Sequence, residues 1–144
     1  MTVQNIVEQQ ETFEAGIKKW QEIEDETISS CDAILGATEN VLVKTIAEVI
    51  KTDSEKHKHV LEVISQTLEG TITLTPDELG VMSELLDKHL ELERGTVALA
   101  SEQLDRSRNF VVKQLLTYLL EDEKKHYLLL KELNDFKKKL YPYG

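Results

Sequence analysis

An internal repeat constrains the fold of this 144-residue chain more than any other feature of the sequence. At the offset that separates His57 from His126, 69 residues, segment 16–62 aligns with segment 85–131 without a gap. Shared helical composition explains matched Leu or Lys, but not a matched Asp-x-x-x-His that follows a matched Glu one helix earlier. We therefore interpret the chain as a duplicated helix hairpin. The matched identities are Lys19/Lys88, Glu22/Glu91, Glu24/Glu93, Thr27/Thr96, Leu35/Leu104, Asn40/Asn109, Val43/Val112, Lys44/Lys113, Asp53/Asp122, Lys56/Lys125, His57/His126 and Leu61/Leu130.

The composition favours long helices. Glycine (6) and proline (2) are scarce, whereas helix-forming residues are plentiful. The length fits one domain that buries a core without disulfides. The 3.6-residue period predicts an all-α, four-helix bundle over residues 1–144, with one repeat at about 4–68 and the other at about 76–140. The expected helices are residues 4–35, 38–67, 76–104 and 108–140, and Thr75 before Pro76 gives the clearest start.

The connections between the helices predict the topology. Polar turns near residues 35–40 and 104–109 imply antiparallel neighbours within each repeat. Between the repeats, Ile72 and Leu74 alternate with threonines, which predicts an extended crossover with both apolar side chains turned inward. Such a crossover spans the bundle only if the second helix ends near Ile64 and the third begins after Glu78, because eight extended residues reach only about 27 Å.

Charge and cysteine content exclude several classes of protein. The formal net charge of −10, from 27 acidic and 17 basic residues, disfavours nucleic acid and anionic membranes as partners. We find no export signal and no apolar run of roughly 18 residues, so we expect a cytoplasmic protein. Cys31 is the only cysteine, which excludes disulfides within the chain and four-cysteine metal sites. We expect it to pack as a small core residue.

Each predicted helix interrupts its apolar stripe near the middle with ionisable or polar residues. Burying unpaired carboxylates costs several kcal/mol each, so these positions need hydrogen-bond partners, protons or a metal. The residues concerned are Glu24 in the first helix, Asp53, Ser54 and His57 in the second, His89 and Glu93 in the third, and Asp122, Glu123 and His126 in the fourth.

The segment Glu123-Lys-Lys-His126 resembles the Glu-x-x-His motif of the ferritin-like di-iron carboxylate proteins, such as rubrerythrin and bacterioferritin. The resemblance implies a ferritin-like bundle in which Glu24 and His57 serve one metal, Glu93 and His126 serve the other, and Glu123 bridges both. It also implies an iron- or manganese-dependent oxidoreductase acting on peroxide, oxygen or ferrous ion. A separate protein would then donate electrons.

The first repeat departs from that motif. Ser54 stands where the second bridging glutamate is expected, and we expect Glu55 to point away from the core. His89, one turn before Glu93, is a candidate replacement ligand. Asp53 and Asp122, four residues before the two histidines, are candidate orienting groups or ion-pair partners. A mononuclear or asymmetric site with iron, manganese or zinc is therefore an alternative to a metal pair.

A metal-free interpretation also remains open. Glu24 and Glu93 can pair with His57 and His126 through charge-assisted hydrogen bonds, which would leave a helical scaffold or binding protein with a decayed site. Trp20, which aligns with His89, is expected to be a large core residue. His59 is expected on the surface. Long amphipathic hairpins usually leave an apolar strip uncovered, so we also expect a homodimer.

Overall fold

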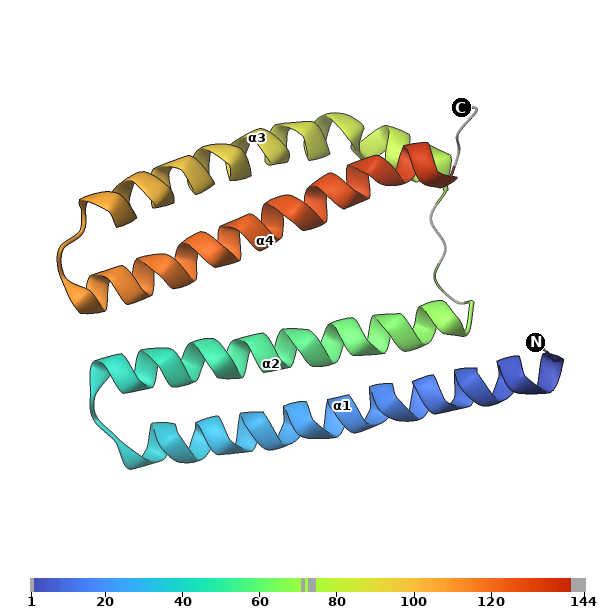
Figure 1. Ribbon diagram of the computed structural model, residues 1–144, viewed down its shortest axis with the longest axis horizontal. Coiled ribbons are helices and arrows are strands. Elements are labelled where there is room, and N and C mark those ends of the chain that lie inside the picture. Colours follow the sequence, from blue (N-terminus) through green and yellow to red (C-terminus); the bar gives the residue numbers. More distant parts are fainter. Residues whose placement is uncertain (1, 71, 73–74, 141–144) are drawn as a thin grey trace. The chain divides into compact units, whose positions relative to one another are not determined.

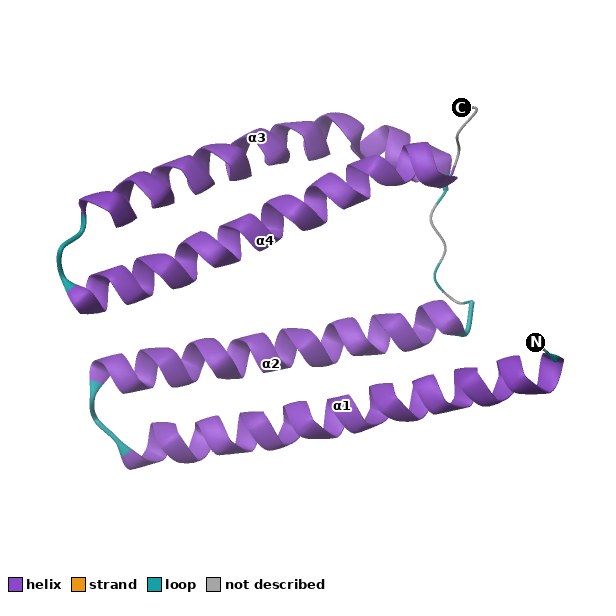
Figure 2. Ribbon diagram, in the orientation of Figure 1, coloured by secondary structure: helices purple, strands orange, loops and turns teal. Residues whose placement is uncertain are grey.

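The computed structural model describes residues 2–70, 72 and 75–140, without the side chains of residues 76 and 137–140. The described part of the chain is helical and contains no strand (Figure 2). This confirms the predicted all-α class. No helix within it combines the length and the apolar character needed to cross a membrane. The helices are α1 (Val3–Ala37), α2 (Val41–Leu68), α3 (Pro76–Arg106) and α4 (Phe110–Leu140).

The chain divides into two compact units, Met1–Thr73 and Leu74–Gly144. In the first, α1 packs against α2, and in the second, α3 packs against α4 (Figure 1). We call these units hairpin 1 and hairpin 2, and each is described by itself. The single domain expected from the sequence, which joins both units, stays a prediction.

Side-chain caps place the helix ends close to the predicted positions. Asn40 accepts a hydrogen bond from the backbone N–H of Val43 at 3.1 Å, and Asn109 accepts one from Val112 at 3.1 Å. The first N–H groups of a helix have no carbonyl partner within the helix, and the asparagine side chain supplies one. Each helix therefore begins just after its asparagine. Both asparagines belong to the matched set. The second helix of each hairpin therefore begins with the same side-chain cap.

The helix ends required for the extended crossover are not observed. α2 continues to Leu68 and is followed by Gly70 at a φ of +79°, a conformation that glycine adopts without a steric penalty. α3 begins at Pro76, because Thr75 and Glu78 cap each other's backbone N–H groups. The expected shifts to Ile64 and beyond Glu78 are therefore wrong.

Other parts of the crossover prediction fall in the segment between the hairpins. Residues 71, 73 and 74 lie outside the described residues, so the position expected for Leu74 is not tested. Ile72 was expected to turn inward, but it is 40% exposed.

The buried residues of hairpin 1 form a line with a spacing of seven residues. Such a heptad line keeps one helix face against its partner along the whole contact. The line contains Ile17, Glu24 and Cys31 on α1 and Ala47, Ser54 and Leu61 on α2. In an antiparallel pair, the register that sets Glu24 against Ser54 places apolar residues above and below them. The polar interruption therefore lies at the centre of the helix contact, and Cys31 packs in the core as predicted.

The matched line in hairpin 2 is less completely buried. Leu86 on α3 is 9% exposed, whereas Glu93 and the facing Glu123 on α4 are half-buried. A line only one residue wide on each helix leaves the flanking apolar side chains uncovered within each hairpin. Exposed examples are Phe13, Ile46 and Ile50 in hairpin 1 and Met82, Leu85, Leu92 and Leu129 in hairpin 2.

Trp20 corrects the prediction of a large core residue, because its side chain is 53% exposed. It lies off the line that runs through Ile17 and Glu24, so its ring lies along the outside of the contact. Glu55 and His59 are exposed, as expected.

Candidate metal centre

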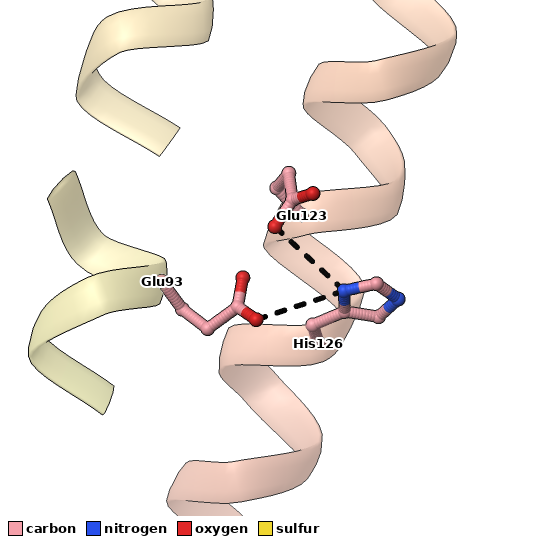
Figure 3. Close-up of side chains that lie close together, drawn as sticks. All are labelled: Glu93, Glu123 and His126. Atoms are coloured by element: carbon pink, nitrogen blue, oxygen red, sulfur yellow. Dashed lines mark ion pairs between the residues drawn. The ribbon is translucent and has the colours of Figure 1, made fainter. Parts of the chain in front are cut away.

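Two carboxylates and an imidazole meet across hairpin 2. Glu93 extends from α3 towards Glu123 and His126 on α4 (Figure 3). The Nδ1 atom of His126 lies 3.8 Å from Glu93 Oε1 and 3.7 Å from Glu123 Oε2. One ligand atom from each of the three residues lies within 4.8 Å of the other two. The i,i+3 spacing on α4 explains why Glu123 and His126 share one helix face.

Two neighbouring residues orient this cluster. Asp122 Oδ2 lies 3.5 Å from His126 Nε2, on the side of the ring opposite to the two glutamates. His89 Nε2 lies 3.1 Å from Glu93 Oε1, one turn away on α3. An Nε2–H that faces Asp122 leaves the Nδ1 lone pair directed at Glu93 and Glu123. This contact agrees with the predicted role of Asp122 as an orienting group or ion-pair partner.

The two glutamates shift each other's pKa in opposite directions. A hydrogen bond with Glu123, opposed by burial, holds the pKa of Glu93 below its usual value. The same hydrogen bond, together with burial and the charge on Glu93, raises the pKa of Glu123. As ionised groups they offer each other only acceptors, so this bond requires the proton. Among the described residues, no donor pairs with the buried Oε2 atom of Glu93.

The donor set and its spacing fit a metal ion. Oxygen and imidazole ligands about 2.1 Å from a tetrahedral ion lie about 3.4 Å from each other. The observed separations of 3.7 and 3.8 Å exceed this value by a few tenths of an ångström, which a small rotamer adjustment removes. Carboxylate and imidazole together suit iron, manganese and zinc.

In hairpin 1 the matched glutamate and histidine are hydrogen bonded to each other. Glu24, whose side chain is 10% exposed, accepts hydrogen bonds on Oε1 from Trp20 Nε1 at 3.1 Å and from His57 Nδ1 at 3.2 Å. Burial by itself raises the pKa of Glu24, but hydrogen bonds from Ser54, His57 and Trp20 outweigh it and lower that pKa. Three donors surround one carboxylate, so Glu24 is stable as an anion without a cation.

The repeat offset relates the two clusters residue by residue. Trp20 corresponds to His89 and Ser54 to Glu123, while the glutamate and the second histidine are the same in both. The structure thus brings Glu24 together with His57, and Glu93 together with Glu123 and His126, with His89 beside them. The expectation that all of these residues share one layer concerns both hairpins and stays a prediction.

The sequence interpretation missed the role of Trp20 as a hydrogen-bond donor to Glu24. The repeat contained the signal, because an indole N–H aligned with an imidazole N–H four residues before the same glutamate.

Comparisons with protein-family models, with curated proteins and with solved structures found no match to this chain.

Proposed function

We propose that hairpin 2 binds a divalent transition metal through Glu93, Glu123 and His126. The observation that supports this most directly is the position of His126 Nδ1, which lies between two carboxylate oxygens but beyond hydrogen-bonding distance of both. The buried, donor-free Oε2 of Glu93 is a second unsatisfied acceptor in the same place. A cation satisfies all three groups at once, whereas a single shared proton satisfies only the two glutamates.

The proposal includes the function that the resemblance implies. The protein is a ferritin-like or rubrerythrin-like metal-binding protein, built on a four-helix bundle, that uses iron or manganese for peroxide, oxygen or ferrous-ion chemistry. A redox metal supplies the electron-transfer steps when it is bound. Glu93, Glu123 and His126 supply its negative and neutral ligands, and Asp122 holds the imidazole ring. A homodimer and an electron-donor protein are further parts of this proposal.

Metal analysis tests the binding step before any activity is assayed. The protein is purified without chelator, and iron, manganese and zinc are measured in the wild type and in a His126→Ala variant. We expect a near-stoichiometric metal in the wild type and a loss of at least about 10-fold in affinity in the variant. A His59→Ala variant, which changes an exposed histidine on α2, is the matched control. A metal-free wild type that also fails to take up added metal would reject the proposal.

Hairpin 1 provides an observation that favours a second candidate function. Glu24 is fully supplied with donors, so a buried carboxylate of this layer exists there without a metal. If hairpin 2 is likewise satisfied by its shared proton, the chain is a metal-free helical scaffold or binding protein. The exposed apolar side chains of both hairpins would then be the functional surface. The same metal analysis separates the two candidates.

A further inference from the structure

The two hairpins differ at the position that faces the matched glutamate, Glu24 or Glu93, from the opposite helix. In hairpin 1 this residue is Ser54, which is 4% exposed and donates a hydrogen bond to Glu24. In hairpin 2 it is Glu123, a second carboxyl group with an oxygen within 4.8 Å of an oxygen of Glu93. A neutral donor completes the hydrogen bonding of a carboxylate, whereas a second carboxylate creates a demand for a cation.

The histidine on the second helix of each hairpin also has different contacts in the two hairpins. His57 Nδ1 lies 3.2 Å from Glu24 Oε1, within hydrogen-bonding distance, so this nitrogen is already engaged as the donor to an ionised Glu24. The matched nitrogen of His126 lies 3.8 and 3.7 Å from its two carboxylates, and its partner at 3.5 Å is Asp122 on the other ring nitrogen. Only hairpin 2 therefore directs an available imidazole nitrogen towards two carboxylates.

The two clusters also differ in that hairpin 1 has Trp20 where hairpin 2 has His89, but this difference does not determine which hairpin binds metal. Both rings place a nitrogen 3.1 Å from the first carboxylate oxygen of the glutamate four residues later. An indole N–H can only donate, so the contact that His89 shares with Trp20 is one that orients the carboxylate. The group of residues within 4.8 Å contains Glu93, Glu123 and His126 but not His89.

Building on the proposed function, we infer that the chain holds one divalent metal ion and that hairpin 2 alone binds it. The residue that determines which hairpin binds the ion is Glu123 in hairpin 2, where hairpin 1 has Ser54. His89 is a positioning residue that donates to Glu93, as Trp20 donates to Glu24. All the proposed protein ligands of the ion come from a single hairpin.

Reciprocal exchange of the deciding residue tests the inference. Bound zinc or manganese per chain is measured by equilibrium dialysis on the full chain. We expect one ion in the wild type, none in Glu123→Ser, and two in Ser54→Glu. Thr52→Glu, which adds the same charge at an exposed position two residues before Ser54, is the matched control and should keep one ion. Circular dichroism checks that each variant is helical.

The outcomes separate this inference from the proposed function. No ion in the wild type rejects the proposed function. Two ions in the wild type, or one ion retained in Glu123→Ser, rejects the inference while metal binding itself stands. Ser54→Glu adds charge to the core, so circular dichroism shows first whether hairpin 1 stays folded; if it unfolds, its ion count is not used. The Glu123→Ser result decides the question in that case, because hairpin 1 already accepts serine at this position.

The positioning role of His89 has its own test. We expect His89→Ala to weaken the bound zinc by about 10-fold and His89→Trp to restore the wild-type affinity to within a few-fold, since the indole repeats the contact seen at Trp20. If His89→Trp binds as weakly as His89→Ala, His89 is a ligand and its assignment as a positioning residue is wrong.

Discussion

The Nδ1 atom of His126 lies 3.8 Å from the Oε1 atom of Glu93, beyond the reach of a hydrogen bond. The matched atoms of His57 and Glu24 are 3.2 Å apart and are hydrogen bonded. The two hairpins therefore hold matched residue pairs at different distances. The glutamate and histidine of hairpin 1 are hydrogen bonded to each other. Those of hairpin 2 are not, and they face a second carboxylate, which is the arrangement expected of a set of metal ligands.

The lowered pKa of Glu24 predicts how hairpin 1 responds to acid. Because the folded-state pKa lies below the usual value of 4.5, ionised Glu24 stabilises the fold above about pH 4.5, and this contribution disappears as the pH falls through the folded-state pKa. We expect Glu24→Gln to be less stable than the wild type at pH 7, with a smaller difference at pH 3. Urea unfolding at the two pH values measures this.

Glu26→Gln is the control for the acid response, because Glu26 is an exposed glutamate on the same helix. It should change stability little at either pH. A destabilisation by Glu24→Gln that is the same at pH 3 and pH 7 would show that shape, and not charge, explains the contribution of Glu24.

The paired asparagine caps predict two equal losses of stability. Asn40 and Asn109 each accept one backbone N–H at 3.1 Å, so each change to alanine should cost about 1 kcal/mol by exposing that donor. Substitution by aspartate keeps the acceptor and should cost much less. Thermal unfolding of the four variants measures this. Unequal costs for the two alanine variants would contradict the equivalence of the two caps.

Substitution of Asp122 is expected to weaken metal binding although Asp122 is not itself a ligand. Its carboxylate lies beside His126 Nε2, so Asp122→Asn removes the charge that fixes the ring while Glu93, Glu123 and His126 remain. We expect a 10- to 100-fold weaker metal affinity, the usual effect of an outer partner of a ligating histidine. Isothermal titration with zinc measures it. Glu121→Gln, one residue away and exposed, should bind as the wild type does; an equal loss in both variants would assign the effect to net charge.

The sequence predicted the helices well because their ends depend on local chemistry. Thr75 was predicted as a cap, and it acts on a backbone group three residues away, so its effect can be read without tertiary information. Asn40 and Asn109 were not predicted as caps, and α2 and α4 begin after them, at Val41 and Phe110 instead of at residues 38 and 108. The meeting of Glu93 with His126 was expected from the polar residues that interrupt each apolar stripe and from the resemblance to ferritin-like proteins. These features need only one hairpin.

Other features depended on geometry that the period does not give. Trp20 was expected inside because a 3.6-residue stripe is wide, but the observed helix contact follows a narrower seven-residue line that excludes it. The ends near Ile64 and Glu78 were inferred from a fold requirement, and the local capping of α3 and the length of α2 determined the outcome instead.

The nitrogen resonances of the histidine rings test the central claim most directly. In a long-range proton–nitrogen NMR spectrum of the full chain, a zinc-ligated imidazole nitrogen shifts away from its free position, and each ring nitrogen is observed separately. We predict that one equivalent of zinc moves the Nδ1 resonance of His126 and leaves both nitrogens of His57 at their metal-free positions. If zinc leaves His126 unchanged, or shifts His57 Nδ1 as well, the assignment of a single metal centre to Glu93, Glu123 and His126 is contradicted.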